Sequence, residues 1–143
     1  MNKKYKIRNI SIKDLANRIT HNKVILPALQ REYVWKQRDI CRLFDSHMQG
    51  YPINTMMFWK SNKLDEISFY KFLNSQYQES VTKNESFNTN FIDDPVSYDI
   101  VIDGQQRITS LWIGLCGSYK TAKAQNPSYL HLRLDPHPNK NDE

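Results

Sequence analysis

Two stretches in the first half of the chain carry apolar residues at the spacing of an amphipathic helix. The first predicts a short helix over residues 12–19, with Ser11 and Asp14 forming a capping box at its start. The second predicts a helix over residues 37–48 that ends just before Gly50. The inward-facing residues of these two helices are expected to be Ile12, Leu15, Ala16, Ile19, Ile40, Leu43, Phe44 and Met48.

Short apolar runs outside these helices predict β-strands. Residues 24–26 form one such run, which Pro27 stops. Residues 54–59 form a second run, apolar enough to predict a strand that is buried on both faces. Residues 129–134 alternate between apolar and polar side chains, which is the pattern of a strand with one buried face.

The clearest unit in the sequence is a strand followed directly by a helix. Residues 98–102 predict the strand, and Asp103 with Gly104 predicts a turn. The residues after the turn predict a helix because their apolar positions have i, i+3, i+4, i+7 spacing. These positions are Ile108, Leu111, Trp112 and Leu115.

The remaining segments predict a third helix, a long loop and a polar tail. Residues 65–81 predict the helix, because Phe69, Phe72, Leu73 and Tyr77 fall on one side. Residues 82–97 are rich in Asn, Thr, Ser, Glu and Asp and are expected to form a mobile loop. We expect one domain over residues 1–134 and a frayed polar tail over residues 135–143. No further helix or strand is predicted after residues 129–134, which suggests that the chain is a fragment of a longer protein.

These elements predict a single α+β domain with a small mixed sheet and packed helices. The 143 residues, 39% of them hydrophobic, suffice for one packed core. No apolar run approaches the roughly 18–20 residues of a membrane span, and the first residues lack the apolar segment of a secretory signal. We therefore expect a cytoplasmic protein with no membrane contact, in which Cys41 and Cys116 are small buried or half-buried apolar residues rather than disulfide partners.

Charge and glycine content narrow the ligand classes only in part. The net charge of +5, from 20 Lys and Arg against 15 Asp and Glu, is compatible with DNA or another polyanion without requiring one. The four glycines fit neither a P-loop nor a Rossmann turn, so any nucleotide must use another phosphate cradle. The four histidines share no metal-ligand spacing.

The first candidate site is the sequence from Asp103 to Arg107, where the strand passes into the helix. Helix N-termini attract anions, and Gly104 lets a ligand approach the backbone. Arg107 would oppose the helix dipole by about 0.3–1 kcal/mol unless an anion lies between them. Asp103 is then a candidate for metal binding, and Gln105 and Gln106 for holding phosphate oxygens or an attacking water. The structural alternative is a capping box of Asp103 and Gln106, with Arg107 paired to a carboxylate of a neighbouring element.

The second candidate site is the sequence Gln30-Arg31-Glu32-Tyr33-Val34-Trp35. An arginine with two aromatic residues in a loop suits a phosphate with a stacked base. The alternative interpretation places Tyr33 and Trp35 against the core and Arg31 in a surface ion pair.

Four blocks of the sequence, in one order, resemble a known bacterial family. The blocks are Leu26-Pro27, Gln30-Arg31-x-Tyr33-x-Trp35, Asp45-Ser46 with Gly50-Tyr51-Pro52-Ile53, and Ile102-Asp103-Gly104-Gln105-Gln106-Arg107-Ile108-Thr109-Ser110-Leu111. Their order resembles the N-terminal domain of GmrSD-type restriction enzymes and of SspE-like phage-defence proteins, over roughly residues 8–134, with a fold similar to the ParB and sulfiredoxin superfamily. Gln105 stands where sulfiredoxins have their cysteine, so sulfinic acid reduction is excluded, and Ile108 replaces the second arginine of ParB relatives.

The resemblance implies a sensor domain of an anti-phage restriction system that binds and hydrolyses a nucleoside triphosphate. A separate HNH-type nuclease domain or subunit would cut DNA, Mg²⁺ would assist hydrolysis, and the full-length protein would contact DNA and form a homo-oligomer. The alternative is a non-catalytic module that binds DNA or a protein partner. The implied catalytic residues are Asp103, also the metal ligand, Gln105 and Gln106, and the implied nucleotide-binding residues are Gly104, Arg107, Gln30, Arg31 and Tyr33.

Overall fold

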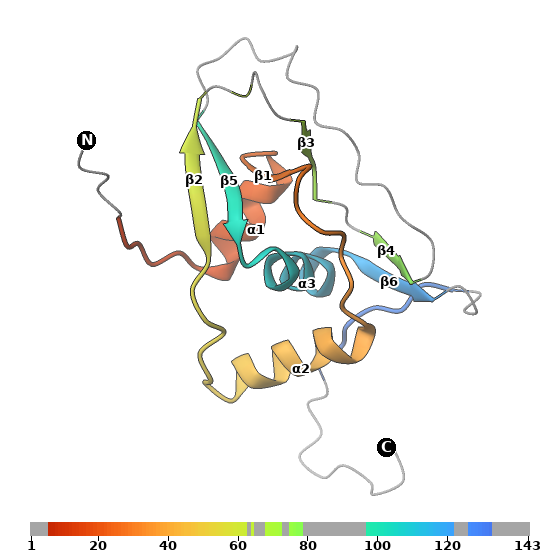
Figure 1. Ribbon diagram of the computed structural model, residues 1–143. Helices are drawn as coiled ribbons and strands as arrows, with labels where there is room; N and C mark the ends of the chain where they lie inside the picture. The colour runs from red at the N-terminus through yellow and green to blue at the C-terminus, as the bar shows by residue number, and fades with distance from the viewer. Residues whose placement is uncertain are drawn as a thin grey trace, which may run out of the picture.

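The computed structural model describes residues 6–62, 64, 68–72, 75–78, 97–121 and 126–132. These residues form three helices and two small sheets (Figure 1). The helices are α1 (Ile12–Thr20), α2 (Gln37–Met48) and α3 (Gln105–Cys116), and the strands are β1 (Val24–Pro27), β2 (Met57–Ser61), β3 (Phe69–Tyr70), β4 (Ser75–Gln78), β5 (Tyr98–Asp103) and β6 (Ser118–Thr121). The predicted α+β class is confirmed. No helix in the described part of the chain is long and apolar enough to span a membrane.

The larger sheet has its two most apolar strands in the middle. Its order is β2-β5-β1-β3, and β4 pairs with β6 in a separate two-stranded parallel sheet. β1 and β5 run parallel, with Ile25 opposite Ile100. β2 lies antiparallel to β5, and β3 lies antiparallel to β1. The sheet is therefore mixed, with a parallel pair at its centre.

The alternation of side chains along β1 and β5 divides the core between the two faces of this sheet. One face meets α1 and α3, in a cluster of Leu15, Ile19, Val24, Leu26, Phe72, Val101, Ile108 and Trp112. The opposite face carries Ile25, Leu64, Phe69, Tyr98 and Ile100. The ion pair between Arg18 and Asp99 also ties α1 to β5.

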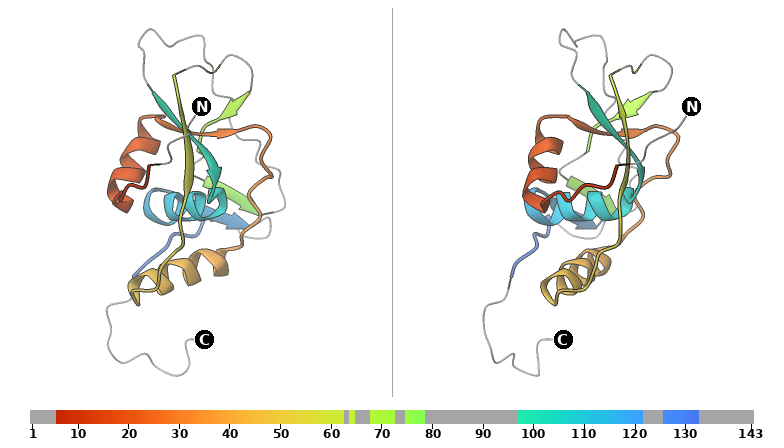
Figure 2. Two further views of the ribbon diagram at one scale, coloured as in Figure 1. Left: turned by 60° about the vertical axis from the view of Figure 1, so that its left-hand side comes forward. Right: turned by 90° about the vertical axis from the view of Figure 1, so that its left-hand side faces the viewer.

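Helix α3 occupies the middle of the molecule. It lies between the larger sheet and α2 in every view (Figure 1; Figure 2). Gly114 permits the close approach of α2, since a Cβ atom there would lie 2.4 Å from Cε2 of Phe44. A third cluster, of Ile40, Ile113 and Tyr119 with the partly buried Tyr33 and Phe44, fills this contact. The central position of α3 explains why eight of its twelve residues are buried.

The helices with a strong apolar stripe agree with the sequence predictions. Helix α1 begins after Ser11, whose hydroxyl oxygen accepts the backbone N–H of Asp14 at 3.0 Å. Helix α2 has the predicted bounds, and Gly50 follows it with a φ of +81°. β1, β5 and α3 are also confirmed.

The predicted helix over residues 65–81 is wrong. Its described part contains strands β3 and β4 instead. Phe69 and Phe72 are both buried, but they contribute to the cores on opposite faces of the sheet. An extended chain can place residues three apart on opposite faces, whereas a helix cannot. Pairing with β1 and β6 therefore overrode the local helical pattern.

Several predictions of burial and strand position are also wrong. β2 is an edge strand rather than a doubly buried one, and Met57 and Trp59 are about half exposed. Met48 and Leu115 are exposed, although they fall on the predicted apolar stripes. Residues 129–132 form no strand, and the strand after α3 is β6. Residues 82–96 of the predicted loop and the tail after residue 134 lie outside the described residues.

Candidate functional site

The site is built where the two parallel central strands end. β1 and β5 point toward the same edge of the sheet, so the segments that follow them leave the sheet side by side. The Nε2 group of Gln30, three residues after β1, donates hydrogen bonds to the backbone carbonyls of Val101 and Ile102 at the end of β5. Parallel pairing thus joins two blocks of sequence that are about 70 residues apart.

Gly104 begins α3 in a conformation that few other residues adopt. It is the N-cap, with a φ of +91° and a ψ of 9°, and a Cβ atom there would lie 3.0 Å from Cγ of Met56. No side chain in the described part of the chain caps the helix. The alternative interpretation with a capping box of Asp103 and Gln106 is therefore wrong, and the first N–H groups of α3 lack the usual side-chain acceptor.

Asp103 and Arg107 lie on either side of this helix start. Oδ2 of Asp103 lies 3.2 Å from Nη2 of Arg107, and Nη1 of Arg107 donates a hydrogen bond of 2.8 Å to the carbonyl of Ile53. The Asp103 side chain is 69% exposed and that of Arg107 is 17% exposed. Exposed ion pairs of this kind contribute about 0–1 kcal/mol, which offsets the unfavourable position of Arg107 on the helix dipole without a large surplus.

The two glutamines are both buried but differ in their contacts. Gln105 is 9% exposed and Gln106 is 7% exposed. Oε1 of Gln106 accepts the backbone N–H of Val34 at 2.9 Å, and its Nε2 donates to the carbonyl of Glu32 at 3.0 Å. The side chain of Gln105 makes no hydrogen bond with any residue that the structure describes. Gln106 is thus committed to the backbone, and Gln105 is not.

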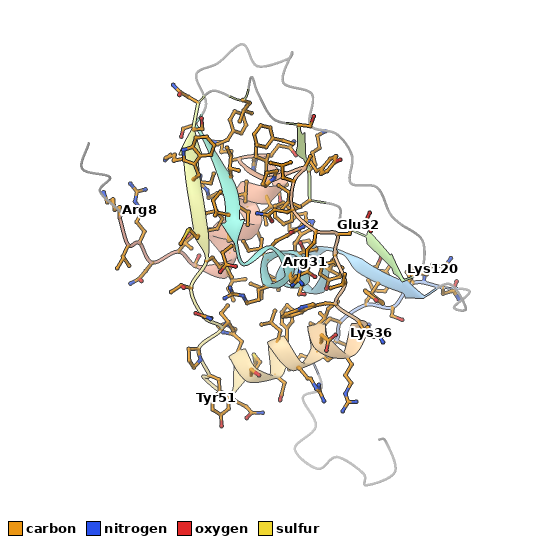
Figure 3. The ribbon with its side chains drawn as sticks, in the orientation of Figure 1. Arg8, Arg31, Glu32, Lys36, Tyr51 and Lys120 are labelled. Atoms are coloured by element: carbon orange, nitrogen blue, oxygen red, sulfur yellow. The ribbon has the colours of Figure 1, made fainter. Side chains whose placement is uncertain are left out.

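The segment after β1 contributes one free cation and one core aromatic residue. Arg31 is exposed, and within the described ranges its guanidinium has neither an ion pair nor a hydrogen bond (Figure 3). The hydroxyl of Tyr33 shares a hydrogen bond of 2.8 Å with that of Ser110, and its ring packs on the third cluster. Burial raises the pKa of Tyr33 well above its ordinary value. This packing agrees with the core interpretation of Tyr33, and its contact with a nucleotide stays a prediction.

Other candidate groups lie away from this site. Cys41 and Cys116 are exposed, so the prediction that they are buried or half-buried is wrong. Among the described residues no three His, Cys, Asp or Glu side chains cluster to hold a metal ion. A small cavity of about 30 Å³ lies between α2, α3 and residues 128–130 rather than at the start of α3.

Two contacts of the site had no signal in the sequence. The carbonyl of Ile53 accepts from Arg107, and the side chain of Met56 crowds Gly104. The first is a backbone group and the second an ordinary apolar side chain, so neither residue type points to the site. Both come from the loop between α2 and β2, which only the folded chain brings to the start of α3.

The fold and the site define an α+β domain in which, among the described residues, no side chain caps the start of α3, and the segment with the exposed Arg31 is bonded next to it. The sequence matches the model of the GmrSD restriction endonuclease N-terminal domain over residues 12–143. The chain belongs to that family, and the predicted resemblance is confirmed. Membership gives it a role in a restriction system, which is a form of phage defence. No curated protein matches the chain.

Proposed function

We propose that this domain binds a nucleoside triphosphate at the N-terminus of α3, hydrolyses it with Mg²⁺, and thereby controls an HNH-type nuclease domain or subunit. The observation that carries the proposal is the uncapped start of α3. Among the described residues, no side chain accepts from its first N–H groups, while Gly104 itself is buried with the side chain of Met56 against it. Helix N-termini of this kind bind phosphate through backbone donors and the helix dipole.

Two arginines supply the charge that a triphosphate needs. Arg31 has no acidic partner among the described residues. Arg107 is held by an exposed carboxylate and one carbonyl, contacts worth about 1 kcal/mol each. A ligand with micromolar affinity gains about 8 kcal/mol, so a phosphate group can displace these contacts. Gln30 contributes by fastening the Arg31 segment to the end of β5.

The acidic and amide groups of the site fit magnesium-dependent hydrolysis. Mg²⁺ in nucleotide sites is usually held by one or two carboxylates, phosphate oxygens and water, so a three-residue cluster is not needed. Asp103 suits this role because its carboxylate is 69% exposed. When bound, Mg²⁺ would neutralise phosphate charge. Gln105, with a free amide, is the better placed of the two glutamines to orient a water molecule, while the catalytic role of Gln106 stays a prediction.

The test is a thermal-shift series with the four nucleoside triphosphates, with and without Mg²⁺. A ligand at a hundredfold excess over its Kd stabilises the native state by about 2.7 kcal/mol. For 143 residues this corresponds to a rise in Tm of about 9 °C. Arg107→Ala should abolish the shift and leave the protein folded, whereas Arg42→Ala, which removes an exposed arginine of α2, should keep it.

The two alternatives give different results in the same series. If no triphosphate raises the Tm of the parent protein, the domain is a non-catalytic module that binds DNA or a protein partner. If a triphosphate binds but phosphate release is absent even with the nuclease part restored, the domain is a nucleotide-binding sensor without hydrolysis. DNA contact and homo-oligomer formation by the full-length protein belong to the same proposal and are measured by salt-dependent DNA binding and by sedimentation.

A further inference from the structure

Gln106 connects α3 to the segment that carries Arg31. Its amide oxygen accepts the N–H of Val34, and its amide nitrogen donates to the carbonyl of Glu32. These two backbone groups belong to the residues on either side of Tyr33. In a parallel β-ladder, one residue likewise bonds to the two residues that flank its partner on the neighbouring strand. The Gln106 side chain therefore takes the place of a peptide group of an adjacent strand. Because it is 7% exposed, solvent competes little for these bonds.

Arg31 lies between two fastened residues. On one side, Gln30 is bound to the carbonyls of Val101 and Ile102. On the other side, Glu32 is bound by Gln106. The side chain of Arg31 itself is exposed and makes no bond in the described part of the chain (Figure 3). The position of Arg31 relative to the start of α3 is thus set through its backbone, by the residue that directly precedes Arg107.

We infer that Gln106 is a positioning residue, which holds Arg31 so that it and Arg107 meet the same phosphate chain. This inference rests on the proposed function. Without Gln106 the Arg31 segment would lose its two bonds to α3 and keep those of Gln30 and Tyr33 and the bond from Tyr119 to the carbonyl of Trp35. Arg31 would then have to be ordered when the ligand binds, and that cost would appear as weaker affinity. In this role Gln106 acts on ligand affinity through the Arg31 segment, separately from the catalytic role predicted for it.

A double-mutant cycle on triphosphate affinity tests the inference. Gln106→Met keeps the size of the side chain and removes both hydrogen bonds, and Arg31→Ala removes the cation. Each single variant should weaken binding about tenfold or more. If Gln106 acts through Arg31, the double variant should bind no more weakly than the weaker single variant. Multiplied losses, or unchanged affinity in Gln106→Met, would overturn the positioning role.

The control for lost stability is Ser11→Ala, which removes the cap of α1, a helix that contributes no residue to the site. It should lower the Tm and leave triphosphate affinity unchanged. If Gln106→Met does not fold, Gln106→Glu takes its place in the cycle, because the carboxylate still accepts the N–H of Val34 but no longer donates to Glu32. A stability loss alone would lower the affinity of both the control and the test variants, and that result would also overturn the inference.

Hydrogen exchange gives a readout that does not depend on any nucleotide. The amide of Val34 should lose protection in Gln106→Met and keep it in Gln106→Glu, while amides of α1 stay unchanged. Unchanged protection in Gln106→Met would overturn the fastening itself. A parent protein that binds no triphosphate would overturn the proposed function, even if Val34 exchanges as expected, so the two failures are distinguishable.

Discussion

Replacing Gly104 with alanine tests the geometry on which the site depends. Gly104 has a φ of +91°, in the left-handed region, and its missing Cβ leaves room for Met56. An alanine would therefore meet two penalties, one from the backbone conformation and one from Cγ of Met56 at 3.0 Å and Cβ of Met56 at 3.4 Å. Gly50 provides a matched control, because it has a φ of +81° but no atom within 4 Å of an added Cβ.

The expected loss of stability follows from these two penalties. A side chain in a sparsely populated backbone region costs about 1–3 kcal/mol, and the stiffer unfolded chain returns about 0.4–1 kcal/mol. Gly50→Ala should therefore destabilise the protein by about 1 kcal/mol. Crowding against Met56 adds about 1 kcal/mol at the low end of overpacking costs, so Gly104→Ala should lose about 2 kcal/mol. For 143 residues these losses lower the Tm by about 3 °C and about 7 °C.

Urea unfolding and thermal melting of the parent and both variants measure these losses. Adding Met56→Ala to Gly104→Ala should relieve the crowding, so that the two changes couple favourably in a double-mutant cycle. Triphosphate binding should fall in Gly104→Ala and persist in Gly50→Ala, since only the first variant alters the start of α3. Equal Tm values for Gly104→Ala and the parent would refute both the left-handed N-cap and its contact with Met56.

Three further predictions concern the site and its support. Asp103→Asn should abolish magnesium-dependent phosphate release and change the Tm little, because its ion pair is exposed; a matching fall in Tm would favour a structural role. Gly114→Ala should destabilise the protein by about 1–3 kcal/mol in urea unfolding, since the new Cβ would lie 2.4 Å from the Phe44 ring, and adding Phe44→Leu should recover part of that loss. Burial raises the pKa of Tyr33 in the folded protein. As the pH rises above about 10, this hydroxyl ionises more readily in the unfolded chain than in the folded one, so the free energy of unfolding should fall. Tyr33→Phe should flatten this alkaline loss in urea midpoints taken across that range, and an unchanged slope would contradict it.

The local elements with complete sequence signals follow directly from the sequence. Helix α1 has its cap residue and an apolar stripe, and α2 has a stripe followed by a glycine in the left-handed region. Both signals act between residues a few positions apart, so the local sequence predicts the helices, although packing of their apolar faces supplies most of their stability. The strand–turn–helix unit of β5 and α3 was predictable for the same reason.

The prediction of a helix over residues 65–81 is wrong because the pattern is local, whereas the strands found there depend on partners far along the chain. The aromatic spacing over residues 65–81 fits a helix, but β3 exists through pairing with β1, about 43 residues earlier in the chain. Similarly, nothing within residues 54–59 shows that β2 lies at the edge of the sheet, where one face and one set of backbone groups are exposed. The order of strands in a sheet depends on partners that are distant in the sequence, and a short apolar run is compatible with a central strand or an edge strand.

The sequence by itself identified the two blocks of the candidate site and the family to which the chain belongs. The tertiary structure alone decided what each residue of those blocks contacts. Adjacent glutamines look equivalent in the sequence, yet Gln106 is bound to the backbone of Glu32 and Val34, while Gln105 has no such partner among the residues that the structure describes. The reason is physical: successive helical residues point about 100° apart, so only one of them faces the segment that the parallel pairing of β1 and β5 brings alongside α3.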